Sequence, residues 1–410
     1  MRLPPFARIL LCWLLTRTAL LLCVFGVLTL RGPDVTTDVS VIYQGWAEIL
    51  RSGSFPRDDV TWQYPPGAAL PVLAPDLLPF LRYEAAFFVL ACGADAVVLG
   101  LLLRRPVSRA GAWTWVAGVP LLGPTVYARY DLMVTAVAVG AVLAVARHPR
   151  TAGALIALGA LVKVWPALLL AGVRPGRGGR RLVASSLVTA GLLAAVLTLA
   201  APHGWDFLFA QRDRGLEVES VGALVFHLAR YAGWEGYVSL HYGSMEFLGP
   251  HVATVATASL LCTVAALAWL VRWRLRVVTW QRSTAADAAL AAVLLFTVTS
   301  RVISPQYLVW LVGLAAAALA LGSARQRVPA GLILAATALT VLEFPLYFDA
   351  VVASEPLGVT LLVLRNGLLL TAAALSCLAL WRSTVARPGA LPATPGDAAA
   401  PEPVRAGSPR

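Results

Sequence analysis

Apolar runs long enough to cross a lipid bilayer recur along the 410-residue chain, and this feature decides its fold class. A helix needs about 20 apolar residues to span the ~30 Å hydrocarbon core of a membrane. Charged residues make up only 13% of the chain, about half of their share in a typical soluble domain. We therefore predict an all-α, polytopic integral membrane protein. Candidate spans cover residues 9–30, 84–103, 111–128, 131–147, 181–201, 251–271, 286–300, 306–322, 329–347 and 359–381.

Two further apolar segments leave the number of spans open between about 8 and 12. The segment 64–82 contains five prolines, which interrupt helical hydrogen bonds. The segment 151–172 contains Lys163 and Pro166. If both segments enter and leave on one side, nearly all arginine clusters between spans face the cytoplasm, as the positive-inside rule expects. The charge pattern thus favours ten spans in the cell (plasma) membrane, with both termini cytoplasmic.

The formal net charge of +12 does not indicate nucleic-acid binding, because the arginines lie in short clusters between apolar runs. All five cysteines lie inside apolar runs, so we predict no disulfide framework. No glycine-rich nucleotide loop, CxxC or HExxH occurs, and the histidine spacing fits no metal signature. We predict no cofactor, and nothing in the sequence indicates a divalent cation.

Two long loops face the outside in this topology, at residues 31–63 and 202–250, and both are rich in acids and aromatic residues. Long loops with their own composition usually carry function. We assign residues 1–382 to one transmembrane domain. Residues 383–410 are rich in Pro, Ala and Gly, and we predict a disordered cytoplasmic tail there.

Two carboxylates in the first outer loop are candidates for a general base. Asp34 and Asp38 are four residues apart, so a helical turn would place both on one side. A carboxylate held at the membrane face by apolar neighbours can accept a proton from a substrate. The alternative for either residue is an acid that is merely solvated. Trp46 and Ile49 are available to rest on the bilayer surface.

Several charges fall inside apolar runs, where they are costly and mark sites or paired structure. Arg17 is expected to snorkel towards the headgroups, and Asp95 to pair with a neighbouring helix. Lys163 is the only lysine of the chain and precedes Pro166, so it could hold a phosphate or a carboxylate.

Two further basic positions lie at the ends of predicted spans. Arg129 and Asp131 sit at an outer junction, where a simple surface ion pair is the alternative to a functional role. Arg301 precedes Ser304 and Pro305. A proline that opens a helix can aim backbone N–H groups at an anion.

Short motifs occur in a fixed order over most of residues 8–347, and Ser-Pro-Gln-Tyr-x-x-Trp is the most specific of them. They are Asp38 to Tyr43, Gly53, Tyr64-Pro65-Pro66, Arg129-Tyr130-Asp131, Ala152-Gly153 with Lys163-Val164-Trp165-Pro166, Arg214-Gly215 with Glu219-Ser220, and Ser304-Pro305-Gln306-Tyr307 with Trp310. In this order and spacing the chain resembles glycosyltransferase family 87, within the GT-C superfamily of polytopic enzymes that use polyprenyl-phosphate sugars.

The resemblance implies a mannosyltransferase-like hexosyltransferase that takes its sugar from a polyprenyl-phosphate donor on the outer face of the membrane. The superfamily's base is an Asp of the first outer loop. That role falls on Asp38, with Asp34 as the second choice. Direct attack with a single base predicts inversion at the anomeric carbon. The acceptor would be a lipid or a glycan, and its binding residues do not transfer from the family.

Basic groups near the leaving phosphate would stabilise the transition state. The candidates for the donor phosphate are Lys163, Arg129, Arg214 and Arg301, the last in a region where relatives vary. The residues expected to line the substrate pocket are Tyr43, Tyr64, Pro65, Asp131, Glu219, Ser304, Gln306 and Tyr307.

Two other functions remain open from the sequence. The first is a transporter or flippase for a lipid or small solute. The absence of an internal repeat and the large acidic outer loops argue against it. The second is a membrane assembly protein that keeps the fold without the chemistry.

Overall fold

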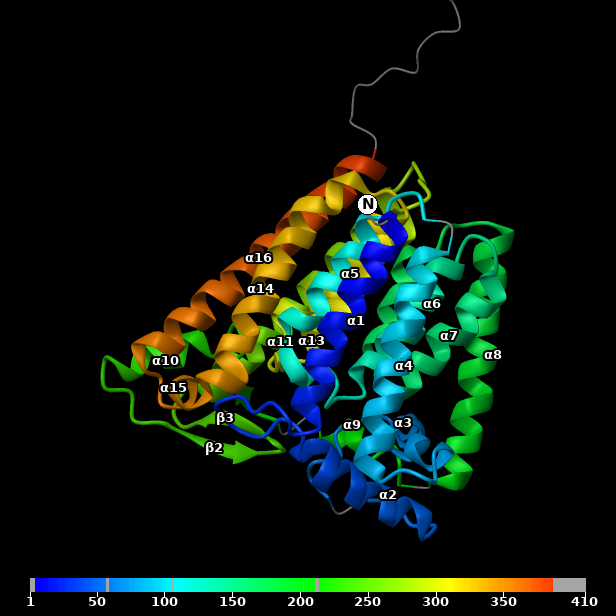
Figure 1. Ribbon diagram of the computed structural model, residues 1–410. Helices are drawn as coiled ribbons and strands as arrows, with labels where there is room; N and C mark the ends of the chain where they lie inside the picture. Colours follow the sequence, from blue (N-terminus) through cyan, green and yellow to red (C-terminus); the bar gives the residue numbers. More distant parts are fainter. Residues whose placement is uncertain (1–3, 57–58, 105, 202, 211–213, 386–410) are drawn as a thin grey trace, which may run out of the picture.

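The computed structural model describes residues 4–56, 59–104, 106–201, 203–210 and 214–385, which form a bundle of helices (Figure 1). Six helical segments of this part of the chain are long and apolar enough to cross a membrane. The predicted all-α, polytopic membrane architecture is therefore confirmed. The six segments are α1 (Pro5–Val24), α4 (Tyr83–Leu103), α8 (Arg177–Ala200), α11 (Val252–Arg276), η6 (Ala324–Gln326) continued by α14 (Arg327–Val341) and η7 (Leu342–Leu346), and α16 (Pro356–Thr384).

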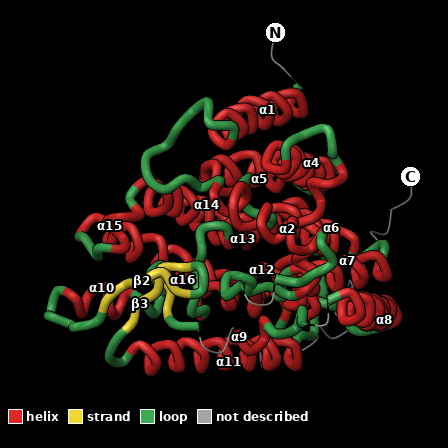
Figure 2. Tube along the Cα trace, turned by 90° about the horizontal axis from the view of Figure 1, so that it is seen from below, coloured by secondary structure: helices red, strands yellow, loops and turns green. Residues whose placement is uncertain are grey.

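Shorter apolar helices form the centre of the bundle. They are α6 (Asp131–Ala144), α7 (Pro149–Val162), α12 (Thr284–Thr299) and α13 (Tyr307–Ala320). Every residue from position 308 to position 320 in α13 is buried. The long helices α8 and α11 instead lie at the periphery (Figure 2), and most of their side chains face outward. The outward-facing helices are those expected to contact lipid.

Neither of the two ambiguous apolar segments forms a single helix long enough to span a membrane. The first is broken into η2 (Pro66–Ala68), α3 (Ala69–Leu73) and η3 (Ala74–Leu77). The second consists of α7 and the 3₁₀ helix η5 (Trp165–Gly172), and the chain leaves the helical conformation at Lys163 between them. Proline opens η2 and stands at the start of η5, as its missing N–H favours.

The described start of the chain and the end of α16 lie at one end of the bundle, and the two long loops lie at the other (Figure 1). Helix α1 ends at Val24, not near residue 30, because Gly26 takes a left-handed conformation that terminates it. Helix α16 continues to Thr384, two residues past the predicted domain boundary. Residues 386–410 of the predicted tail lie outside the described residues.

The first long loop contains η1 (Asp38–Tyr43), a π-helical segment that runs directly into α2 (Gln44–Arg51). Trp46 of α2 is buried and donates a hydrogen bond from Nε1 to Asp59 Oδ2 at 2.7 Å. The expectation that Trp46 rests on the bilayer surface is therefore wrong. Its ring packs against Tyr43 with 5.5 Å between centroids, so α2 supports the segment that carries Asp38.

The second long loop contains α9 (Phe207–Ala210), α10 (Leu224–Arg230) and a small antiparallel sheet that the sequence did not predict. The strands are β1 (Leu216–Glu217), β2 (Tyr237–His241) and β3 (Ser244–Leu248), in the order β1-β3-β2. Leu216 and Val238 both pair with Phe247, which is fully buried. Further along the chain, after α14 and η7, the short helix α15 (Phe348–Val352) precedes α16.

A buried ion pair ties α1 to α4. Arg17 Nε lies 2.8 Å from Asp95 Oδ2, and both side chains are almost completely buried. The same carboxylate accepts hydrogen bonds from the indoles of Trp13 and Trp115 and from the Tyr127 hydroxyl. The prediction that Asp95 pairs with a neighbouring helix is confirmed. Snorkelling of Arg17 to the headgroups is wrong, because neighbouring helices enclose the guanidinium.

Replacing the buried carboxylate should destabilise the bundle. In Asp95→Asn the Arg17 guanidinium stays buried without its counter-charge, and breaking such a pair typically costs about 3–5 kcal/mol. We expect a clearly lower thermal unfolding temperature of the purified protein in detergent. The control is Asp76→Asn, which breaks the half-exposed ion pair with Arg51 and should cost at most about 1 kcal/mol. Equal effects of the two substitutions would contradict a structural role for the buried pair.

Candidate active site

Asp38 stands at the first residue of η1 and faces a buried arginine. Arg129 Nε lies 3.0 Å from Asp38 Oδ2, and the Asp38 side chain remains 33% exposed. Arg129 is held by two further hydrogen bonds, from Nη1 to the carbonyl oxygens of Val35 and Ala128. A fixed cation thus positions a carboxylate that is still open to a substrate.

Asp34 lies in a different environment. It is exposed, and its Oδ1 accepts hydrogen bonds from the backbone N–H and the hydroxyl of Thr36 at 2.8 and 2.7 Å. These bonds stabilise a turn ahead of η1. The expected helical turn with both carboxylates on one side does not form, because the helical conformation begins only after Asp34.

Asp131 and Lys163 form the second charged pair of the site. Asp131 is the first residue of α6, and its Oδ1 lies 2.7 Å from Lys163 Nζ. The same oxygen accepts a 2.7 Å hydrogen bond from the indole of Trp310, in the first turn of α13. The surface ion pair between Arg129 and Asp131 therefore does not exist. Of the two ligands considered for Lys163, the structure supplies a carboxylate.

Four aromatic rings surround the Lys163 ammonium. Nζ lies 5.1 Å from the ring centroids of Tyr64 and Tyr130, 5.2 Å from Trp310 and 5.7 Å from Tyr307. At these distances each ring attracts the cation electrostatically. Gly67 allows the turn after Tyr64 to reach this place, since a Cβ there would lie 2.4 Å from the Leu161 carbonyl oxygen. Segments from four parts of the chain thus meet around one ammonium group.

Several buried polar atoms around these pairs have no hydrogen-bond partner among the described residues. They are the hydroxyls of Tyr43 and Tyr130, Asp131 Oδ2 and Trp165 Nε1. Buried polar groups in native proteins are almost always satisfied, by protein, water or ligand. These atoms are therefore available to form hydrogen bonds with a ligand that carries hydroxyl groups.

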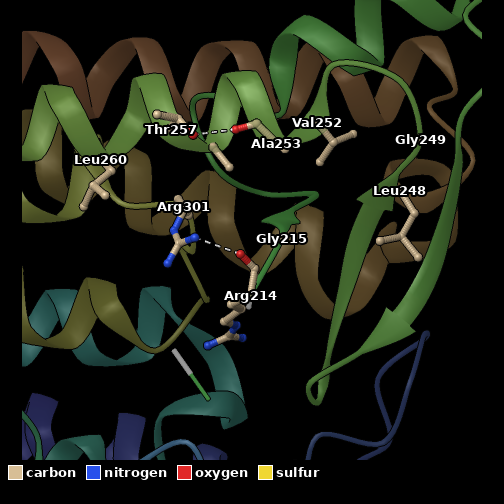
Figure 3. A pocket seen from close by; sticks show the side chains of 10 residues that line it. Arg214, Gly215, Leu248, Gly249, Val252, Ala253, Thr257, Leu260 and Arg301 are labelled. Carbon is tan, nitrogen blue, oxygen red and sulfur yellow. Dashed lines mark hydrogen bonds between the residues drawn. The ribbon is translucent and has the colours of Figure 1, made fainter. Parts of the chain in front are cut away.

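A groove of about 460 Å³ lies beside this site, between α11 and the second long loop (Figure 3). Aliphatic side chains and glycines form part of its wall, polar atoms form much of the rest, and its charged lining residues are Arg214 and Arg301. Arg301 donates from Nη1 to the backbone oxygen of Arg214 at 2.8 Å. Burial, followed by the nearby charge of Arg214, lowers the pKa of Arg301. The two guanidinium groups that line the groove favour an anion there.

Glu246 of β3 fixes the orientation of Arg214. It is fully buried and accepts from Arg214 Nε at 3.3 Å and from the backbone N–H of Gly215 at 3.0 Å. Ser244 links the two side chains, accepting a 2.9 Å bond from Arg214 Nη2 and donating to Glu246. The small sheet thus holds Arg214 in a fixed position beside the groove.

Tyr64 lies near charges of the first long loop and of the groove. Burial raises its pKa, and the charges of Asp131 and Asp38 raise it further, whereas those of Arg214 and Arg129 lower it. Tyr64 therefore lies within electrostatic range of all four charged side chains. The paired charges and Arg214 of the groove are therefore neighbours.

The remaining predicted pocket residues hold the second long loop against the bundle. Ser304 donates to Glu217 Oε1 at 3.0 Å, and Glu219 is buried next to α16, where its backbone oxygen accepts from Arg365 Nη2. Burial raises the pKa of Glu219, followed by the neighbouring carboxylates of Glu217 and Glu343. Two more predicted residues mark helix starts, Pro65 before η2 and Gln306 before α13.

The sequence interpretation missed four charged residues of this region. Glu343 and Arg365 form a completely buried ion pair of 2.8 Å. Both lie in apolar runs, so the cost of charge in a membrane was a signal that could have found them. Glu217 and Glu246 had no such signal, because acids in a polar loop look like solvated residues.

Among the residues that the structure describes, no set of three or more His, Cys, Asp or Glu side chains lies close enough together to hold a metal ion. The prediction that no cofactor is needed stays a prediction.

The segment that carries Arg214 is anchored by a buried histidine. His227 Nε2 lies 2.8 Å from the Val218 carbonyl oxygen, and Nδ1 lies 2.8 Å from the Ser354 hydroxyl. A carbonyl only accepts, so Nε2 carries the proton and Nδ1 accepts from Ser354. Burial lowers the pKa of His227 to about 4. Neutral His227 therefore fits its two partners, and protonation would break one of these bonds.

Comparison with known proteins gives one match. The family model described as glycosyltransferase family 87 matches residues 62–258. This segment includes Tyr64, Arg129, Asp131, Lys163 and Arg214, whereas Asp38 and Arg301 lie outside it. No curated protein and no solved structure matches the chain.

The buried histidine predicts a pH dependence of stability. A base whose pKa falls on folding, here from 6.5 to about 4, leaves the unfolded chain with more bound protons between these values. Stability should be complete above about pH 6.5 and decline as the pH falls towards 4. We expect thermal unfolding in detergent to show this decline in the wild type and a shallower one in His227→Gln. Identical pH profiles for the two proteins would rule out His227 as the titrating group.

Proposed function

Because the chain belongs to glycosyltransferase family 87 and is a membrane glycosyltransferase, we propose that it transfers a hexose from a polyprenyl-phosphate donor. We propose mannose as the sugar and a lipid or a glycan as the acceptor. The reaction takes place on the face of the membrane that carries the two long loops. In this proposal that face is the outer one, and both termini are cytoplasmic.

The groove along α11 is the observation that carries this proposal. Its apolar wall includes Val252, Ala256 and Leu260, one above the other on α11, and it ends at Arg214 and Arg301. Helix α11 is at the periphery of the bundle (Figure 2), so a lipid can enter the groove from the bilayer. An isoprenyl chain fits the apolar wall, and a phosphate fits two guanidinium groups, which bind such oxygens well.

The proposed chemistry needs one base and a stabilised leaving group. The acceptor hydroxyl attacks the anomeric carbon while the bond from that carbon to the phosphate oxygen breaks. Asp38 takes the hydroxyl proton, and the polyprenyl phosphate leaves with the electron pair of the broken bond. Arg214 and Arg301 stabilise the charge that develops on the phosphate. Direct attack from the opposite face inverts the configuration.

We assign Lys163 a role in orienting the sugar rather than in binding the phosphate. Its ammonium has a carboxylate partner at 2.7 Å, closer than the 3.3 Å between Arg214 and Glu246, and four aromatic rings surround it. Together with Trp310 it fixes Asp131, whose Oδ2 has no partner among the described residues. That oxygen can accept a hydrogen bond from a sugar hydroxyl. Arg129 similarly serves to position Asp38.

The test of the base is Asp38→Asn. The amide keeps the shape of the side chain but cannot accept the proton, so the rate of transfer should fall by about 10²–10⁴. The assay supplies purified protein with radiolabelled polyprenyl-phosphate mannose and a membrane extract as the acceptor source. Asp34→Asn tests the second candidate, and Asp76→Asn serves as a control for an acid outside the site.

Full activity of Asp38→Asn together with loss in Asp34→Asn would move the role of base to Asp34. Transport of a lipid or solute by the purified protein without any sugar transfer would instead support the transporter alternative.

A second test addresses the phosphate site. In Arg301→Gln, donor binding loses charge-assisted hydrogen bonds, each worth about 1.5–3 kcal/mol. We expect the KM for the donor to rise at least tenfold, the factor that about 1.4 kcal/mol represents. The matched control is Arg276→Gln at the opposite end of α11, for which KM should not change. A donor KM unchanged in Arg301→Gln would contradict this assignment of the groove.

A further inference from the structure

A second groove, far from the candidate active site, lies between α1 and α4. It has a volume of about 400 Å³, and its lining includes Phe6 and Trp13 of α1 with Ala96, Gly100 and Arg104 of the α4 segment. The two helices run antiparallel, so Trp13 faces the Ala96 end and Phe6 faces the Arg104 end. Trp13, which donates a hydrogen bond to Asp95, lines one end of the groove, and the other end lies towards the end of the bundle that holds the N-terminus (Figure 1).

The groove exists because Gly100 of α4 has no side chain to fill the space beside α1. A Cβ placed on Gly100 would meet no atom within 4 Å, so nothing from the described protein occupies the space in front of it. The rise of an α-helix is 1.5 Å per residue, so the stretch from Ala96 to Arg104 is about 12 Å long. This length is close to half of the ~30 Å hydrocarbon core, the depth that one lipid leaflet supplies.

The positive charge of Arg104 at the Phe6 end of the groove indicates which class of ligand the groove binds. The Arg104 side chain is exposed and forms no hydrogen bond or ion pair with the described residues. It lies on the face of the protein that carries the arginine clusters of residues 147–150, 174–181 and 272–276. Basic groups at the mouth of an apolar pocket between transmembrane helices bind anionic lipid headgroups.

We propose that this groove is a binding site for an anionic phospholipid of the leaflet on the side of the termini. One acyl chain lies along Ala96 and Gly100, and the phosphate contacts Arg104. The site is separate from the groove of Arg214 and Arg301, and the proposal does not depend on the enzymatic activity.

Occupancy of the site would support the packing of α1. Trp13 lines the groove and also donates to Asp95, so a lipid chain in the groove would pack against a side chain that holds the Arg17–Asp95 pair. Helix α1 leads directly into the first long loop, which carries Asp38. Lipid bound here should therefore stabilise the position of this loop against the bundle.

The experiment compares variants with matched controls in nanodiscs of phosphatidylcholine titrated with phosphatidylglycerol. Gly100→Leu fills the groove, and Gly191→Leu makes the same substitution in α8, where a Cβ also meets no atom within 4 Å. Arg104→Gln removes the headgroup contact, and Arg181→Gln removes an exposed arginine of α8. Native mass spectrometry counts the lipids retained, and thermal unfolding gives the stabilisation.

The wild type and both α8 controls should retain phosphatidylglycerol in preference to phosphatidylcholine. Arg104→Gln should weaken retention about fivefold, the effect of one basic residue near an anionic membrane surface, and Gly100→Leu should abolish the specific adduct. Soluble glycerophosphate should not stabilise the protein, because it lacks the acyl chain. Retention of both lipids alike by the wild type would overturn the proposal. So would retention by Gly100→Leu equal to that of Gly191→Leu, or stabilisation by glycerophosphate alone.

Discussion

Charges inside a lipid-surrounded bundle must be paired by their neighbours, because hydrocarbon cannot solvate them. In this chain three such pairs, Arg17–Asp95, Lys163–Asp131 and Arg365–Glu343, join different helical segments. Apolar surfaces alone do not select partners in a membrane, since lipid tails are as apolar as leucine. The ion pairs therefore specify which helices are adjacent, and they hold α1 against α4, α6 against the end of α7, and η7 against α16.

Hydrophobicity and proline placement predict the course of the chain through the bundle, whereas contacts between helices are not encoded locally. Five prolines correctly indicated that residues 64–82 form no continuous helix. The environment of Arg17 was misjudged because its partner is 78 residues away and three aromatic donors share the same carboxylate. The small sheet also escaped prediction, since β1 has only two residues and depends on pairing with β3.

In the candidate site too, the sequence identified the unusual residues but not their partners. The sequence indicated Asp38, Arg129, Asp131 and Lys163 as unusual charges, but suggested a pairing of Arg129 with Asp131 that the fold does not use. Each of these residues lies at the start or the end of a helix or beside one. Their partners depend on which helix ends lie close together in the fold. The sequence of a single helix does not determine this.

The candidate site lies where the helices of this protein are interrupted. The start of α6, the end of α7 and the start of α13 converge on Asp131, Lys163 and Trp310. Irregular backbone at membrane depth is tolerated only where protein buries it or where it lines a cavity. The proposed reaction requires both conditions, because its donor has a lipid chain that stays in the bilayer and a sugar that must be hydrogen-bonded. Pro166 and Pro305, beside two of these helix ends, interrupt regular helical hydrogen bonding where such a sugar would be held.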